Sequence, residues 1–203
     1  MNPNELTLEF ILGEIKKLQY LYGLKHEIRY GQSRPEGDLT ESVAEHIYGM
    51  HLLIHYFLPL ENPAGDWDTL RIFSMATMHD FDEIETGDII AYLKTPEQSA
   101  LELEAGFKVI ANAPAHVRDT FSSHLTEYNE RQSIESRFVK AIDVFEPLVQ
   151  MYNEFGRAII AKNQQGSEQA FRLKNEATKP FPIMHAYFQA IHNAMIREGF
   201  FLH

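Results

Sequence analysis

The residues with the clearest chemical potential are a neighbouring histidine and aspartate, His79-Asp80, in the segment RIFSMATMHDFDEIETGD. The seven residues before the pair are mostly apolar or small, so the chain is predicted to be buried where it reaches the pair. Two ionisable neighbours at the end of a buried segment need partners, because an unpaired buried charge is costly. Imidazole and carboxylate together suit a divalent metal ion (Mn, Co, Ni, Fe, Zn or Mg) without selecting one of these metals.

Two further carboxylates follow this pair. Glu83 is four residues after His79 and three after Asp80, so it lies on the same side of the helix if the helix continues that far. A carboxylate beside a metal ion can orient or deprotonate a bound water. Asp88 follows in a TGD turn and can place another carboxylate at the mouth of the same pocket.

Two distant residues can complete a metal site. His46 opens a predicted helix, and Asp143 lies among apolar residues in the segment KAIDVFEPLVQMY. A buried aspartate is rare without a compensating partner. A lone His-Asp dipeptide carries little information, and His46 alone could simply make a hydrogen bond at a helix start. Together the residues predict a site for one divalent metal ion formed by His46, His79, Asp80 and Asp143.

The elements that position these residues are predicted to be helices. Apolar residues recur at three- and four-residue spacing, and the alternation typical of strands is missing. We therefore predict an all-α fold and a single domain over residues 1–203, with a core over about 8–160 and a C-terminal helical extension over about 167–203. The expected helices run from about Leu6 to Tyr22, Ser42 to Pro59, Asp66 or Asp68 to Glu85, Glu97 to Ala111, Pro114 onwards, Ser133 to Asn163, and Ile183 to Arg197.

Three local features refine these helices. Ser42 and Glu45 have the spacing of a capping box, and Gly23 is a plausible stop for the first helix. Pro147 should kink the long helix and free the carbonyl of residue 143. The first helix carries an apolar stripe that we expect to be buried, formed by Phe10, Ile11, Ile15, Leu18 and Leu21.

The composition excludes several classes of protein. There are no cysteines among the 203 residues, which excludes disulfides and thiolate metal sites. A net charge of −11 argues against binding duplex nucleic acid, although local cations can still bind a small phosphate substrate. There is no run of 18 apolar residues and no basic, signal-like start, so we expect a cytoplasmic protein that does not bind membranes.

The ordered pattern H…HD…D resembles the HD-domain superfamily of metal-dependent phosphohydrolases. The stretches SVAEH, HDxxExxTGD and EYxxxxSxExxxVKxxD are similar to the subgroup of bacterial 5′-deoxynucleotidases and their eukaryotic relatives. The resemblance covers about residues 8–160, and the HDxxExxTGD element is its most specific part. In this chain the third stretch consists of Glu127-Tyr128, Ser133, Glu135, Val139-Lys140 and Asp143.

The resemblance implies a helical HD fold and a metal ion held by the four residues above. It implies that Glu83 is the acid/base residue near the attacking water, with Asp88 close to the water or the sugar. It also implies that Arg29 binds the phosphate, which a planar guanidinium can grip with two hydrogen bonds. Alternatively, Arg29 is a solvated charge in a loop. Arg34 is a second candidate for the phosphate-binding arginine.

The sequence departs from the family where the substrate is chosen. Tyr30 stands where the family often has tryptophan, and we expect it to contact substrate. The segment after the TGD turn is IIAYLKTP instead of an LPTP-like loop, and Lys94 within it could approach a phosphate. The loop before His46 is longer, and we recognise no family pattern in the last 40 residues.

The sequence thus predicts a metal-dependent hydrolase of phosphomonoesters, with (deoxy)nucleoside 5′-monophosphates as substrates and a homodimeric assembly. One alternative is a nucleotide pyrophosphohydrolase or phosphodiesterase of the same superfamily. Another is a nucleotide-binding regulatory module without catalysis. His51 and His55 have a spacing that can bind metal. They lack the glutamate of an HExxH motif, so we interpret them as packing or surface histidines.

Overall fold

The computed structural model describes residues 8–31, 40–89, 94–164 and 166–201. Over these ranges the regular structure is helical, and an isolated β-bridge pairs Ile28 with Ser42. The predicted all-α fold is therefore confirmed. Within the same ranges, no helix is both long enough and apolar enough to cross a bilayer.

The chain forms ten α-helices and two 3₁₀ helices over the described residues. They are α1 (Leu8–Leu21), η2 (Tyr22–Lys25), η3 (Arg29–Gly31), α2 (Val43–Glu61), α3 (Thr69–Met78), α4 (Glu83–Thr86), α5 (Pro96–Ala111), α6 (Ala115–Glu130), α7 (Ile134–Met151), α8 (Glu154–Lys162), α9 (Ser167–Thr178) and α10 (Pro182–Arg197).

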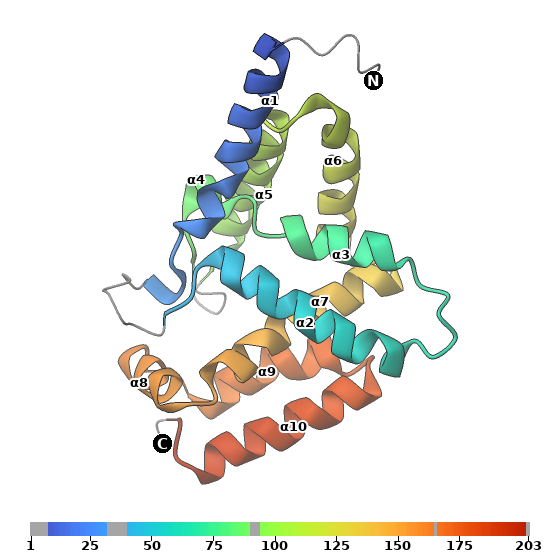
Figure 1. Ribbon diagram of the computed structural model, residues 1–203. Coiled ribbons are helices and arrows are strands. Elements are labelled where there is room, and N and C mark those ends of the chain that lie inside the picture. The colour runs from blue at the N-terminus through green and yellow to red at the C-terminus, as the bar shows by residue number, and fades with distance from the viewer. Residues whose placement is uncertain (1–7, 32–39, 90–93, 165, 202–203) are drawn as a thin grey trace.

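Helix α7 occupies the centre of this arrangement. It contacts α2, α3, α6, α8, α9 and α10. Figure 1 shows α1, α5 and α6 at one end of the molecule and α8, α9 and α10 at the other, with α2, α3 and α7 between them. Helix α7 therefore connects the central helices with α6 on one side and with α8, α9 and α10 on the other.

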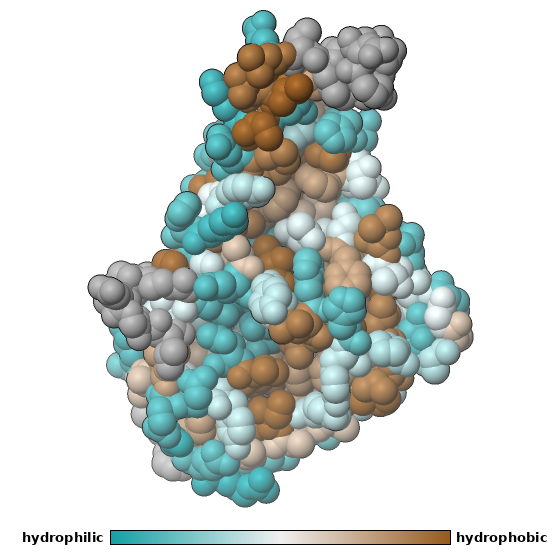
Figure 2. Space-filling model, viewed as in Figure 1, coloured by the Kyte–Doolittle hydropathy of each residue, from teal (hydrophilic) through white to brown (hydrophobic). Residues whose placement is uncertain are grey.

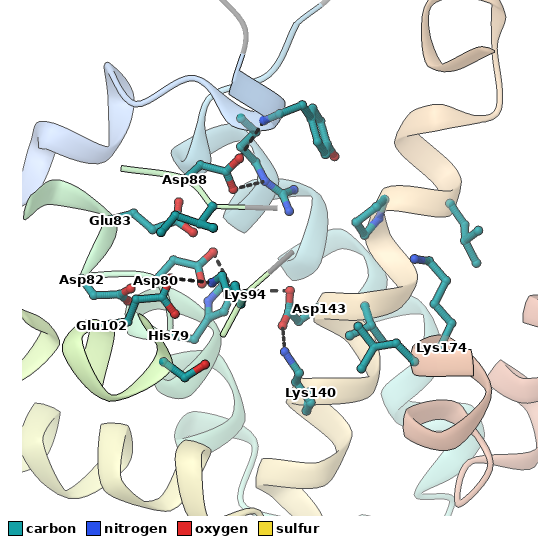
Figure 3. A pocket seen from close by; sticks show the side chains of 18 of the residues that line it. His79, Asp80, Asp82, Glu83, Asp88, Lys94, Glu102, Lys140, Asp143 and Lys174 are labelled. Carbon is teal, nitrogen blue, oxygen red and sulfur yellow. Dashed lines mark hydrogen bonds and ion pairs between the residues drawn. The ribbon is translucent and has the colours of Figure 1, made fainter. Parts of the chain in front are cut away.

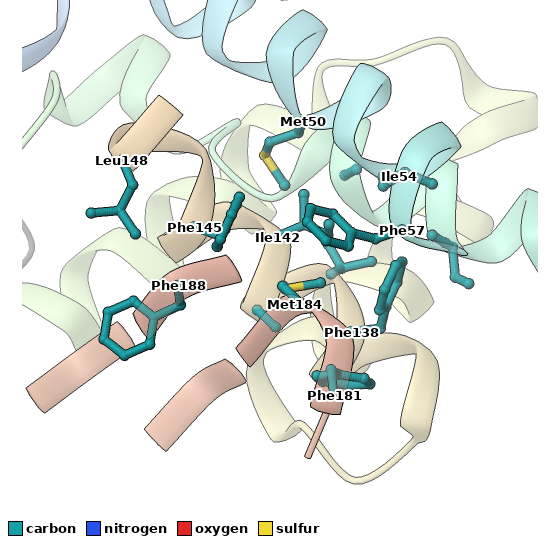
Figure 4. Close-up of a cluster of buried hydrophobic side chains, with 14 of the residues drawn as sticks. Met50, Ile54, Phe57, Phe138, Ile142, Phe145, Leu148, Phe181, Met184 and Phe188 are labelled. Atoms are coloured by element: carbon teal, nitrogen blue, oxygen red, sulfur yellow. The ribbon is translucent and has the colours of Figure 1, made fainter. Parts of the chain in front are cut away.

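Two apolar clusters fix these helices. The larger one surrounds α7 and includes Phe57, Phe145 and Phe188, from α2, α7 and α10 (Figure 4). The second joins the start of α2 to α5 and α6 and includes Met78 at the end of α3. Met78 is fully buried and directly precedes His79. The histidine-aspartate pair therefore lies at the edge of the second apolar cluster, where several helices meet.

The predicted helix starts agree with the structure at several points. The Ser42 side chain accepts a hydrogen bond from the Glu45 backbone and the Glu45 side chain accepts one from the Ser42 backbone, which forms the expected capping box. Asp68 caps α3 and Ser133 caps α7. These caps fix where α2, α3 and α7 begin.

The helix predicted to reach Glu85 ends earlier. Helix α3 stops at Met78, a turn spans residues 79–82, and α4 starts at Glu83. Backbone bonds from Phe81 to Met78 and from Glu83 to Asp80 make this turn. The pair therefore lies at the C-terminal end of α3, in the turn that leads to α4.

The long helix predicted from Ser133 to Asn163 is also interrupted. Helix α7 includes Pro147 but ends at Met151, and Asn153 caps α8 by accepting a hydrogen bond from the backbone of Gly156. A Cβ at Gly156 would lie 2.0 Å from the Met151 carbonyl oxygen, so the tight break requires glycine there. The apolar periodicity continues across the break, which is why the pattern predicted one helix.

The prediction that the apolar stripe of α1 is buried is wrong for most of its length. Phe10, Ile11, Ile15 and Leu18 are each at least 40% exposed, and none of the α1 residues is buried. Only its last turn, with Leu21, packs against the second apolar cluster. Figure 2 shows the resulting hydrophobic surface at the α1 end. The periodicity is real, but no element within the described residues covers it.

Candidate metal centre and active site

Three of the four predicted metal ligands converge in the structure. Candidate ligand atoms of His46 on α2, His79 after α3 and Asp143 on α7 all lie within 4.8 Å of one another. Asp143 Oδ1 lies 3.4 Å from His46 Nε2 and 3.7 Å from His79 Nε2. Asp80 approaches the same centre, with Oδ2 3.0 Å from His79 Nε2 (Figure 3).

The outer nitrogen of each imidazole has a partner that fixes the ring. His79 Nδ1 donates to the Ala76 carbonyl at 3.0 Å, and His46 Nδ1 lies 2.7 Å from Glu146 Oε2. The two buried Nε2 atoms face carboxylate oxygens at 3.0–3.7 Å, but neither makes a hydrogen bond of acceptable geometry with any described residue. Outer partners of this kind orient metal-binding histidines and leave Nε2 as the ligand atom. The residues present therefore fit a divalent cation.

The Asp143 carboxylate is oriented in the same way. Its Oδ2 accepts hydrogen bonds from Tyr128 Oη and from Lys140 Nζ, each at 2.7 Å. Its Oδ1 is left to face the two histidines. Both outer partners belong to the third stretch of the sequence pattern, EYxxxxSxExxxVKxxD, although the pattern alone did not assign them a role.

The electrostatics of the cluster also favour a cation. Burial alone would lower the pKa of His79, but the carboxylates of Asp80 and Asp143 raise it to about 10. Burial would raise the pKa of Asp80, yet His79 holds it at about 2. The pKa of Asp143 is held well below its usual range by Lys140 and the two histidines, against the effect of burial. The site thus attracts positive charge, which a divalent ion would supply in place of protons.

Glu83 faces the same cavity from α4. It is almost fully buried, and its Oε2 has no hydrogen-bond partner among the described residues. Burial, reinforced by Asp80 and Asp88, raises the pKa of Glu83 well above its usual value. Burial, with Asp80 and Glu102, likewise raises the pKa of Asp82 to about 7. Carboxyl groups tuned in this direction can exchange protons near neutral pH.

Asp88 holds the first loop. Its Oδ2 accepts a hydrogen bond from the Tyr30 backbone at 2.7 Å, and Tyr30 has a left-handed φ of 64°. Asp88 Oδ1 lies 3.8 Å from Arg29 Nε. The Arg29 guanidinium also donates to Glu41 Oε1 at 2.8 Å and lies 3.6 Å from Glu146 Oε2. The TGD turn therefore positions Arg29 and Tyr30 beside the cavity.

A cavity of about 420 Å³ joins these groups. His46 is fully buried and does not line it, and Arg34 lies outside the described residues. Lys94 lines it, but its Nζ lies 3.0 Å from Glu102 Oε1. The other predicted residues that line it are Arg29, Tyr30, His79, Asp80, Glu83, Asp88 and Asp143.

Sequence reasoning missed several residues at this site. Glu146 follows Asp143 by three residues, a spacing that places both on one side of α7 and could have revealed it. Glu41 and Lys174 carried no comparable signal, because Glu41 directly precedes a helix cap and Lys174 lies on a helix outside the recognised pattern.

The contact between Glu146 and His46 leads to a testable prediction about Gly49. A Cβ at Gly49 would lie 2.6 Å from Glu146 Oε1, and Glu146 is held in place by His46 and Arg29. We expect Gly49→Ala to displace Glu146 and to weaken metal affinity by roughly 10- to 100-fold, the usual cost of losing an outer partner. Titration of the metal-free protein with Mn²⁺ measures the effect.

Gly13→Ala is the matched control. Gly13 also lies within a helix, and a Cβ there meets nothing within 4 Å. Its Mn²⁺ affinity should equal that of the wild type. Equal affinities for the two alanine variants would show that the Glu146 contact does not support the metal site.

Comparison with known proteins agrees with this arrangement. The family model described as HD domain matches residues 21–184. The 5′-deoxynucleotidase HDDC2 of Dictyostelium discoideum is 27% identical over 158 residues, 71% of this chain and 75% of that protein. The 5′-deoxynucleotidase YfbR of Salmonella newport (strain SL254) is 31% identical over 134 residues, 59% of this chain and 67% of that protein.

Solved structures share the fold. A crystal structure of a "predicted metal-dependent phosphohydrolase" from Magnetospirillum magnetotacticum MS-1 matches with a TM-score of 0.79 and 19% identity, covering 95% of this chain and 98% of that one. An HD-domain phosphohydrolase from Listeria innocua matches with a TM-score of 0.59 and 21% identity, covering 91% and 86%.

The chain belongs to the HD domain family, as the ordered histidine and aspartate pattern indicated. It is an HD-domain metal-dependent phosphohydrolase.

Proposed function

We propose that the protein is a 5′-nucleotidase that removes phosphate from (deoxy)nucleoside 5′-monophosphates. The observation that carries this proposal is the convergence of His46, His79 and Asp143, with Asp80 beside them, next to the cavity that Glu83 lines. The names of two relatives at 27% and 31% identity support the choice of substrate.

His46, His79, Asp80 and Asp143 would hold the divalent ion. Such an ion supplies a Lewis acid and a water of lowered pKa. The reaction forms a bond from the water oxygen to phosphorus, breaks the bond from phosphorus to the 5′ oxygen, and delivers a proton to that oxygen. We assign the proton transfer from the water to Glu83, because its carboxyl group lines the cavity with a raised pKa and one oxygen without a hydrogen-bond partner among the described residues.

The substrate side of the proposal rests on the first loop. Arg29 and Tyr30 line the cavity, and Asp88 fixes both through their backbone and side-chain contacts. We propose that Asp88 acts by holding this loop as well as by facing the sugar. Lys94 is proposed to contact substrate only after it separates from Glu102.

A phosphate-release assay over a nucleotide panel tests this function. Metal-free enzyme should release no phosphate, and added Mn²⁺ or Co²⁺ should restore release from nucleoside 5′-monophosphates, with deoxyribonucleotides preferred. Nucleoside 3′-monophosphates serve as the control for the position of the phosphate on the sugar. Activity that persists in the metal-free enzyme, or that ignores the position of the phosphate, would contradict the proposal.

The cavity also gives a reason to include triphosphates and phosphodiesters in the panel. It is lined by five cationic side chains, Arg29, Lys94, Arg131, Lys140 and Lys174. A cation-rich pocket is the feature that favours a pyrophosphohydrolase or phosphodiesterase. Three of the five, however, are paired with carboxylates at 2.7–3.0 Å, which reduces the charge available to a polyphosphate. Metal-dependent binding of a nucleotide without release of phosphate would instead favour a nucleotide-binding regulatory module without catalysis.

The expected homodimer is retained as a proposal. The exposed apolar residues of α1 form a contiguous surface that a second copy of the chain could cover. Sedimentation of the wild type beside a variant with Ile11→Glu and Ile15→Glu tests it, since a dimer formed through α1 should become monomeric in that variant.

A further inference from the structure

One side chain of the cavity has no place in the proposed chemistry so far. Lys174 lies on α9 and lines the cavity together with Asp143, which lies in the middle of α7. Figure 3 shows it reaching in from one side, while Asp82, Glu83 and Glu102 lie on the other side, beyond Asp80 and His79. The two sides of the cavity therefore differ in charge.

Lys174 also differs from three of the other four cations that line the cavity, and the fourth, Arg131, is exposed. Arg29, Lys94 and Lys140 each have a carboxylate oxygen within 3.0 Å. No ion pair or hydrogen bond of the Lys174 ammonium is found within residues 8–31, 40–89, 94–164 and 166–201. The side chain is only partly exposed, and apolar lining residues such as Leu148, Ile160 and Met195 face the same cavity. A half-enclosed ammonium without a partner gains more than a solvated one from binding an anion.

The charges around Lys174 show that its surroundings do not neutralise it. Burial lowers the pKa of Lys174 to about 8; Asp143 opposes the shift, whereas Arg29 and Lys140 add to it. Asp143 is also a proposed metal ligand, so a bound cation would leave less of its negative charge for the lysine. The part of the cavity beside Lys174 is then the part that best accepts negative charge.

A phosphate group fits this region better than it fits the opposite side. Asp82, Glu83, Asp88 and Glu102 line the other side, and carboxylates repel a phosphate unless they are protonated. Lysine is a strong phosphate ligand because its ammonium is a compact point charge with three donors. A nucleobase carbonyl could accept one hydrogen bond from it but would leave its charge uncompensated.

We propose that Lys174 binds an oxygen of the substrate phosphate, from the side of the cavity opposite Glu83. The identity of the substrate in this assignment rests on the proposed function. The binding of a phosphate group by Lys174 does not depend on it. It places the phosphate between the metal site and α9 and leaves the Glu83 side for the attacking water. It also gives the C-terminal helices, which the sequence pattern left without a role, a direct part in binding.

Inorganic phosphate is the probe that tests the proposal apart from catalysis. Calorimetric titration of the Mn²⁺-loaded wild type with phosphate should show binding, and Lys174→Met should weaken it about tenfold or more, as the loss of a charge-assisted hydrogen bond predicts. Lys174→Arg, which keeps the charge, should recover part of the affinity. Lys179→Met is the matched control, since Lys179 is exposed at the end of the same helix.

Turnover provides the second measurement. In Lys174→Met, the KM for nucleoside 5′-monophosphates should rise by a similar factor for every base, with the Mn²⁺ content unchanged. Unaltered phosphate affinity in a folded, Mn²⁺-loaded Lys174→Met would overturn the proposal, as would a KM effect confined to one base or a wild type that does not bind phosphate. A wild type that binds phosphate but hydrolyses no monophosphate would refute the proposed function, and the titration would still decide the role of Lys174.

Discussion

Replacement of His79 by alanine is expected to abolish metal binding and hydrolysis together. His79 Nε2 lies within 3.0 Å of Asp80 and 3.7 Å of Asp143, and its Nδ1 is already committed to the Ala76 carbonyl. Loss of an outer partner alone costs roughly 10- to 100-fold, so loss of the ligand itself should lower kcat/KM by at least about 100-fold.

Elemental analysis and phosphate release should both be measured, beside the variant His55→Ala. His55 packs against Phe73 on the exposed face of α2 and is not part of the converging group. It should keep the metal content and activity of the wild type. If His79→Ala retains a stoichiometric metal ion and its activity, the metal site is not the one formed by His46, His79, Asp80 and Asp143.

The residues that the sequence grouped into one site lie close together in the structure, but the chain between them follows a different path from the predicted one. His79 and Glu83 were related through a continuous helix, yet the structure has a turn between α3 and α4. Both side chains still line the cavity, because α4 begins at Glu83 and returns it to the same side. Residue types and their order constrain the chemistry, whereas the local backbone depends on contacts that are distant in sequence.

The first helix shows a different limit. The three- and four-residue spacing of its apolar residues correctly predicts a helix but cannot say what covers its apolar face. Phe10, Ile11, Ile15 and Leu18 remain exposed because α1 projects beyond the helices that pack around α7. The spacing of apolar residues shows only that one face of the helix is apolar. Burial of that face requires contact with another segment of the chain or with another chain.

The supporting residues of the site separate into predictable and unpredictable ones. Glu146 could have been predicted from its helical spacing to Asp143, once α7 was known to continue beyond it. The position of Lys174 at the cavity could not have been predicted. It depends on how α9 packs on α7 after the break at Met151. The apolar spacing of the chain does not reveal that break, so the position of α9 cannot be derived from it.

Replacement of Glu83 by glutamine is expected to separate catalysis from metal binding. The amide has nearly the same shape but cannot accept a proton from water. Loss of a general base lowers kcat by about 10²- to 10⁴-fold. Metal content should not change, because Glu83 is not among the converging ligand atoms. Steady-state kinetics and elemental analysis of the variant measure the two effects, with Glu85→Gln as the control: Glu85 is exposed on the same short helix, and glutamine can still accept the hydrogen bond from Tyr20.

The pH dependence gives this prediction its sharpest test. Burial, Asp80 and Asp88 raise the pKa of Glu83, so the proton that must leave before it can act as a base is held more tightly than in an ordinary carboxyl group. A cation bound by Asp80 would offset that residue's contribution, whereas the effect of burial would remain. In the wild type, kcat should therefore fall as the pH is lowered through the pKa of Glu83. The residual kcat of Glu83→Gln should lack this fall, since no carboxyl group remains at the position. A variant that keeps the wild-type acid limb would show that another group, of which Asp82 is the nearest in sequence with a raised pKa, accepts the proton.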